Sequence, residues 1–315
     1  MTLPILDATP MWLRRFTKFV AASTLFLIFA GAMVTSTGSG LAVPDWPLSY
    51  GMLMPPMVGG IFYEHGHRMI AATVGFLTLL QAIGLQRSEP KRFLRMLGWW
   101  SVGAVIAQGL LGGLTVKLLL PKSVSIAHAG LAEIFLCLNV AIAFFASKSF
   151  LTLRNYERGD APVASTTALV ALAYAQILIG ALMRHLGAGL AIPTIWVIPP
   201  FTSSAVIVNF AHRIGAILVA AVVVMIAIRL SRFELNHPLR IVANFLVLFV
   251  ATQILLGMYT VWSGKQPVIT SLHVMIGALT LATSLVLALT ARAVAWRAQK
   301  QSSVLGPRSS IEVTA

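Results

Sequence analysis

Long apolar stretches, separated by short polar segments, run along almost the whole chain. A helix needs about 20 mainly apolar residues to cross the hydrocarbon core of a bilayer, and eight stretches reach this length. We expect transmembrane helices at about 16–37, 67–86, 94–117, 126–147, 163–185, 208–230, 241–262 and 270–291. The pattern therefore predicts an all-α integral membrane protein with eight transmembrane helices.

The composition agrees with this class. Hydrophobic residues make up 58% of the 315 residues, and charged residues make up only 10%. The mean hydropathy is +0.87, whereas a soluble domain carries about 25% charged residues. Membrane lipid is therefore the expected surrounding of the helices.

The net charge of +14 is spread unevenly over the loops. Of the 23 Lys and Arg residues, 17 lie at every second helix boundary, counted from the N-terminus. Basic residues concentrate in cytoplasmic loops, so both termini are predicted to be cytoplasmic and the charge is not interpreted as a nucleic-acid-binding surface. The N-terminal segment does not resemble a signal or transit sequence, which favours a bacterial plasma (inner) membrane.

The chain contains an internal repeat at an offset of 145 residues. In the N-terminal part of each copy the offset is 149, because residues 38–44 correspond to residues 187–193. An even number of helices per copy predicts two parallel-repeat four-helix units, 1–150 and 151–315, joined within 148–162; the second ends in a short cytoplasmic tail. Identities at offset 145 include the seven pairs His67/His212, Arg68/Arg213, Gln108/Gln253, Gly112/Gly257, Thr115/Thr260, Val116/Val261 and His128/His273.

Four histidines belong to this repeat, two in each copy: His67, His128, His212 and His273. Each is expected to begin an even-numbered helix at its outer end, so all four should lie at one depth. A structural zinc site usually has four protein ligands, whereas two opposed imidazoles suit a haem iron between helices. We therefore predict that these histidines are haem-iron ligands rather than ordinary hydrogen-bonded side chains.

Three charged residues near the histidines are further candidates. Arg68 and Arg213 follow two of the ligands and can either pair with haem propionates or extend to lipid headgroups. Glu64 breaks the symmetry, because its repeat partner is Asn209. One interpretation gives Glu64 a chemical role at the haem of His67, and the other makes it a helix N-terminal cap.

Two other features have a structural interpretation beside the chemical one. Glu133 follows His128 within a predicted helix, where it either handles protons or forms a structural pair. Glycines inside the helices, such as Gly109, Gly112 and Gly113, are expected to allow close helix packing. We assign these glycines no chemical role.

The ordered set of motifs over about residues 15–295 resembles the haem A synthase family. The resemblance implies oxidation of the C8 methyl group of haem O, by successive hydroxylation, to the formyl group of haem A. The motifs are Thr37-Gly38-Ser39-Gly40-Leu41, Asp45-Trp46-Pro47, Glu64-x-x-His67-Arg68, Gln108-x-Leu-Leu-Gly112, His128, His212-Arg213, Gln253-x-Leu-Leu-Gly257 and His273.

The resemblance also implies a division of labour between the two copies. His67 and His128 would bind the substrate or product haem, His212 and His273 would bind a resident haem b, and Glu64 would be the catalytic carboxylate. The implied partners are haem O synthase, an electron donor chain and cytochrome oxidase, and a homo-oligomer remains open. The alternative is a non-catalytic bis-histidine dihaem b cytochrome, but such proteins usually place their haems at different depths.

Overall fold

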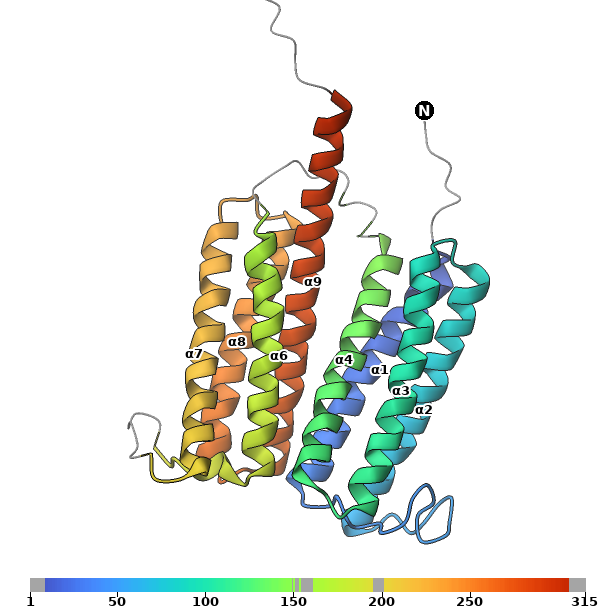
Figure 1. The fold of residues 1–315 in the computed structure, drawn as a ribbon, viewed down its shortest axis with the longest axis vertical. Helices are drawn as coiled ribbons and strands as arrows, with labels where there is room; N and C mark the ends of the chain where they lie inside the picture. The colour runs from blue at the N-terminus through green and yellow to red at the C-terminus, as the bar shows by residue number, and fades with distance from the viewer. Residues whose placement is uncertain (1–8, 149, 151–152, 154–160, 195–200, 306–315) are drawn as a thin grey trace, which may run out of the picture.

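A computed structural model describes residues 9–148, 150, 153, 161–194 and 201–305. All regular structure in these residues is helical, and eight of the helices are long and apolar enough to cross a membrane (Figure 1). This confirms the predicted fold class. The helices are α1 (Met11–Ser36), α2 (Gly59–Ser88), α3 (Arg92–Lys117), α4 (Lys122–Ala146), α6 (Val163–His185), α7 (Ser204–Leu230), α8 (Pro238–Trp262) and α9 (Pro267–Leu305), with a short 3₁₀ helix, η3 (Ala188–Leu190).

Several helices begin before the predicted boundary. The largest difference is at α2, which begins at Gly59 and not at residue 67. Hydropathy placed the boundary too late because the first turns of α2 carry Glu64, His65 and Arg68, which are polar but have hydrogen-bond partners in the adjacent loop. The ligand candidate His67 therefore lies about two turns inside its helix.

The helices form two groups, α1–α4 and α6–α9 (Figure 1). In each group the helices pack against their sequence neighbours and the first packs against the last; the groups meet where α1 contacts α9 and where α4 contacts α6 and α9. The first helix begins and the last helix ends at the same end of the bundle (Figure 1). The cytoplasmic orientation of this end and the domain division stay predictions, and most of the predicted join 148–162 lies outside the described residues.

A buried amide holds the first group together. Asn139 of α4 accepts hydrogen bonds from Gln81 of α2 (2.9 Å) and Ser101 of α3 (3.0 Å), and it donates to Thr24 of α1 (3.3 Å). Each of the four helices thus contributes one polar side chain. Such bonds stabilise helix packing in lipid, where each is worth about 1 kcal/mol.

An arginine in the last turn of α6 links the two groups. Arg184 donates to the hydroxyl of Ser36 (2.6 Å) and to the carbonyl of Ala32 (3.0 Å), both on α1. Ser36 in turn lies 2.9 Å, hydroxyl to hydroxyl, from Ser271 of α9, two residues before His273. This contact ties the ends of α1, α6 and α9 together close to the second pair of histidines.

Candidate functional site

The two histidines of the second half face each other across the helix bundle. The ring centroids of His212 on α7 and His273 on α9 are 6.4 Å apart, and the ring planes are inclined by 70°. An imidazole nitrogen binds a metal at about 2.0–2.1 Å, and it lies roughly 1 Å from its ring centre, so two imidazoles on one metal have centroids about 6 Å apart. The spacing of His212 and His273 therefore fits two axial ligands of one haem iron.

A glycine on the preceding helix lies against each of the four candidate ligands. A Cβ atom at any of these glycines would approach the Cε1 atom of the imidazole to 3.0–3.2 Å, closer than an ordinary contact. The glycines thus set the position of the rings, a role that sequence reasoning missed. The contacts are Gly31 with His67 (3.0 Å), Gly112 with His128 (3.2 Å), Gly180 with His212 (3.0 Å) and Gly257 with His273 (3.1 Å).

One helical turn before the glycine, a glutamine contacts three of the four histidines. Two of the amides donate to the backbone carbonyl of the histidine, and all three lie beside a ring nitrogen. Leu27 occupies this position on α1, four residues before the Gly31 that faces His67. The bonds join Gln108 to the His128 carbonyl (2.9 Å), Gln176 to the His212 carbonyl (2.7 Å) and Gln253 to the His273 ring (3.4 Å).

The ring of His273 is oriented by its second nitrogen. Nδ1 donates to the backbone carbonyl of Gln253 (3.1 Å), whereas Nε2 lies 3.4 Å from the Gln253 amide, so a metal bound at Nε2 would take the place of this amide contact. The Nδ1 atoms of His67 and His128 are buried and have no hydrogen-bond partner among the described residues. An unpartnered buried nitrogen is a feature that a bound ligand or water can satisfy.

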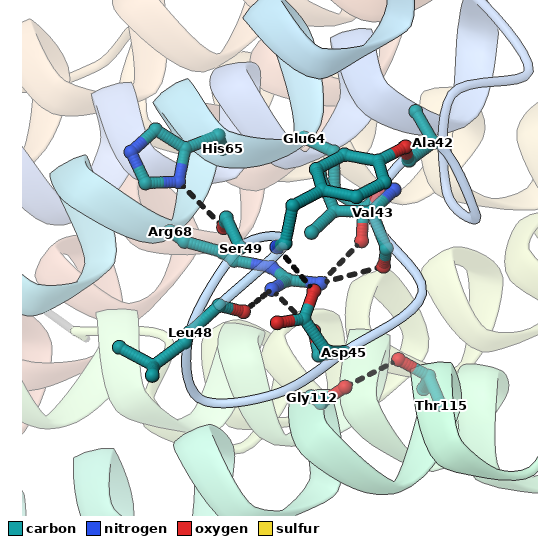
Figure 2. A network of polar contacts seen from close by, with 11 residues as sticks. Ala42, Val43, Asp45, Leu48, Ser49, Glu64, His65, Arg68, Gly112 and Thr115 are labelled. Carbon is teal, nitrogen blue, oxygen red and sulfur yellow. Dashed lines mark hydrogen bonds and ion pairs between the residues drawn. The ribbon is translucent and has the colours of Figure 1, made fainter. Parts of the chain in front are cut away.

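Glu64 is buried, and both of its carboxylate oxygens are engaged (Figure 2). One oxygen lies 2.6 Å from the guanidinium of Arg68, and the other accepts the backbone N–H of Val43 (2.8 Å). The N-cap of α2 is Val58, six residues earlier, so the helix-cap interpretation of Glu64 is wrong. Glu64 instead joins α2 to the loop 37–58, three residues from His67.

Arg68 and Arg213 bind the loops that precede α2 and α7 in the same way. Arg68 donates to the carbonyls of Val43 (3.1 Å) and Asp45 (2.7 Å), as Figure 2 shows. Arg213 donates to the carbonyls that correspond to these at the offset of 149, as the bonds to Ile192 and Thr194 (both 2.6 Å) show. Both guanidiniums therefore hold loop backbone, and a contact with haem propionates stays a prediction.

The loop 37–58 packs against α2, which carries His67, and against α3. Hydrogen bonds from the backbone N–H groups of Gly51 (2.8 Å) and Tyr50 (2.7 Å) hold the pKa of the Asp45 carboxyl below its usual value. The next residue, Trp46, packs so closely on Gly113 of α3 that a Cβ atom there would lie 2.8 Å from the indole. His65 bonds to Ser49 through Nδ1 (2.8 Å), so this histidine anchors the loop.

Glu133 is buried on α4, and its Oε2 atom has no hydrogen-bond partner among the described residues. The repeat places Ala278 at the equivalent position of α9. The structural pair that one interpretation expected for Glu133 is therefore not observed at this oxygen.

Each half carries two candidate ligand histidines, and the described residues contain no group of three or more His, Cys, Asp or Glu side chains that could bind a metal ion. The eight apolar helices define the class as a multi-pass membrane protein. The sequence matches the cytochrome oxidase assembly protein family (COX15-CtaA) over residues 58–286, and the chain belongs to this family.

Curated relatives of the chain carry the name haem A synthase. One from Symbiobacterium thermophilum is 30% identical over 75% of this chain and 81% of its own length. Another from Shouchella clausii is 29% identical, with coverages of 79% and 86%. A third from Novosphingobium aromaticivorans is 26% identical, with coverages of 89% and 95%. These bacterial relatives and the eight helices identify a multi-pass bacterial membrane protein.

Proposed function

We propose that the protein is a haem A synthase, which oxidises the C8 methyl group of haem O to the formyl group of haem A. The observation that carries this proposal is a repeated pair of histidines in a member of the cytochrome oxidase assembly family, with the buried Glu64 three residues before His67 and Asn209 at the equivalent position of the second half. The spacing of His212 and His273, at 6.4 Å between ring centroids, supports haem as the bound group.

In this proposal the two halves have different tasks. His67 and His128 hold haem O as substrate and haem A as product, whereas His212 and His273 hold a resident haem b. The resident haem supplies one-electron transfer at its iron. The four glycines bring the preceding helix against each imidazole and so restrict the position of the ring. Arg68 and Arg213 fix the external loops over the two sites, and we propose that they also contact propionates.

Glu64 is the proposed catalytic carboxylate. Its position three residues before His67 places it on the helix that carries a substrate ligand. There it can stabilise positive charge that develops on the methyl carbon, or accept a proton from attacking water. Arg68 and the Val43 amide hold both oxygens and so orient the carboxylate. Asn209, the counterpart in the second half, cannot accept a proton in this way.

The reaction requires partners in the same membrane. Successive hydroxylation removes electrons from the methyl carbon, so an electron-transfer chain must take part. Haem O synthase would supply the substrate, and cytochrome oxidase would receive the product, in line with the family description. The oligomeric state stays a prediction.

The test is conversion by the purified protein. The detergent-solubilised chain, supplied with haem O, an electron-transfer partner and oxygen, should yield haem A, identified by mass and by the pyridine haemochrome spectrum. A chain with His67→Ala should bind the resident haem but give no product. Two haems b in the purified protein and no conversion would favour the alternative dihaem cytochrome.

A further inference from the structure

Three of the four candidate ligands lie beside a Gln-x-x-x-Gly pair on the preceding helix. Residues four apart share a helix face, so the glutamine and the glycine both face the histidine. On α1 the glycine is kept as Gly31, but Leu27 stands where α6 has Gln176. His67 therefore has the contact with a glycine, but the face of α1 that carries this glycine offers no glutamine amide.

The glutamine ties two helices together at the ligand. The amide of Gln176 donates to the His212 carbonyl (2.7 Å) and also lies 3.1 Å from Nδ1 of the ring. The amide of Gln108 makes the same backbone bond to His128 (2.9 Å). Such a bond opposes both rotation of the imidazole and separation of the helices. Leu27 supplies only apolar contact, as part of a cluster with Val74 and Phe135.

A second difference between the halves concerns charge. The guanidinium of Arg68 is paired with Glu64 (2.6 Å). Arg213 contacts backbone carbonyls and has no acidic partner among the described residues. An anionic haem propionate is therefore attracted more strongly by the second half than by the first. This difference and the missing amide both weaken the hold on a haem in the first half.

We propose that Leu27 makes His67 the most weakly held of the four ligands and so sets the rate at which haem leaves and enters the first site. This inference rests on the proposed function, because a synthase must release its product haem while it keeps its resident haem. Leu27 is a positioning residue: it acts through His67 and the helix that carries it, and takes no part in the chemistry.

The test measures haem loss, which requires no turnover. The full chain, loaded with haem b at both sites, is mixed with excess apomyoglobin, and transfer is followed spectroscopically. We expect a fast and a slow phase, and the fast phase should be missing from His67→Ala. In Leu27→Gln the fast phase should slow by roughly two- to tenfold, the factor expected for one hydrogen bond. Leu27→Met is the matched control, because it has similar length without an amide and should leave the rate unchanged.

The reciprocal variant keeps the test decisive if Leu27→Gln folds poorly. Gln176→Leu gives the second half the side chain of the first, and it should speed the slow phase by roughly two- to tenfold. Equal effects of Leu27→Gln and Leu27→Met, or unchanged rates in Leu27→Gln and Gln176→Leu, would overturn the proposal. A chain that shows the predicted rates but makes no haem A would contradict only the proposed function.

Discussion

Glu64 and Arg68 form an ion pair 2.6 Å long on one face of α2, whereas the equivalent Asn209 donates to the loop carbonyl of Ala188 (2.8 Å). The two halves share the arginine contact with the loop that precedes the helix. They differ in whether a carboxylate stands beside it. This is the clearest chemical difference between the two candidate sites.

The ion pair gives the first prediction. Glu64→Asn copies the second half, and it should abolish haem A formation while the protein still binds haem. The loss of stability should stay below the roughly 3–5 kcal/mol typical of a broken buried pair, because Arg68 keeps its bonds to the carbonyls of Val43 and Asp45. Product analysis and thermal unfolding of the purified variant measure the two effects separately.

A loop variant serves as the control for Glu64. Ser49→Ala removes the hydroxyl that bonds to His65 (2.8 Å) and so loosens the same external loop while Glu64 is kept. Haem A formation should persist in this variant. If Ser49→Ala lost as much activity as Glu64→Asn, the carboxylate would be a loop anchor and not a catalytic group.

The helices and the histidine pairs could be predicted from the sequence, because both leave a periodic signal. Hydrophobicity alone defines eight membrane helices, and an offset of 145 residues connects His67 with His212 and His128 with His273. The start of α2 at Gly59 was missed. Hydropathy counts a carboxylate or guanidinium as exposed to water and does not register the loop amides and carbonyls that satisfy it.

The contacts around the histidine rings could not be predicted from the sequence and became visible only in the structure. Gly112 was expected only to allow close helix packing, but it faces the ring of His128. Gly31 and Gly180 follow the offset of 149 that holds for the first loop of each half, so the repeat contains the signal for them. The bond of Arg184 to Ser36 across the two halves has no signature in a single sequence.

The second prediction concerns membrane orientation. The loops between α2 and α3 and between α7 and α8 lie at the end of the bundle where α1 begins, as does the end of α4 (Figure 1). Basic residues concentrate near these loops, so reporter fusions at about residues 90, 155 and 235 should all read cytoplasmic. An external signal from any of the three would contradict the proposed orientation.

The third prediction distinguishes the two halves by the type of haem that is lost when a candidate ligand histidine is replaced. His212→Ala and His273→Ala each remove one of two opposed rings 6.4 Å apart, so both should lower the haem b content of the purified protein. His67→Ala and His128→Ala should instead lower the content of haem O and haem A. Extraction and chromatography of the bound haems measure the contents. Identical losses of every haem type from all four folded variants would refute functionally distinct sites.

The last prediction uses the glycines that face the ligands. A Cβ atom at position 31 would lie 3.0 Å from Cε1 of His67, so Gly31→Ala should displace the imidazole and reduce haem binding in the first half. Gly180→Ala should do the same to His212 and the second half, because its contact is also 3.0 Å. Overpacking of this kind typically costs about 1–3 kcal/mol, which corresponds to roughly five- to 150-fold in haem affinity if the cost falls on the ligand.

Gly109→Ala is the control, since nothing lies within 4 Å of a Cβ atom there. Titration of the haem-depleted proteins with haem b measures the affinities, and a Gly31→Ala protein that binds as tightly as the Gly109→Ala protein would show that the close contact does not position the ligand.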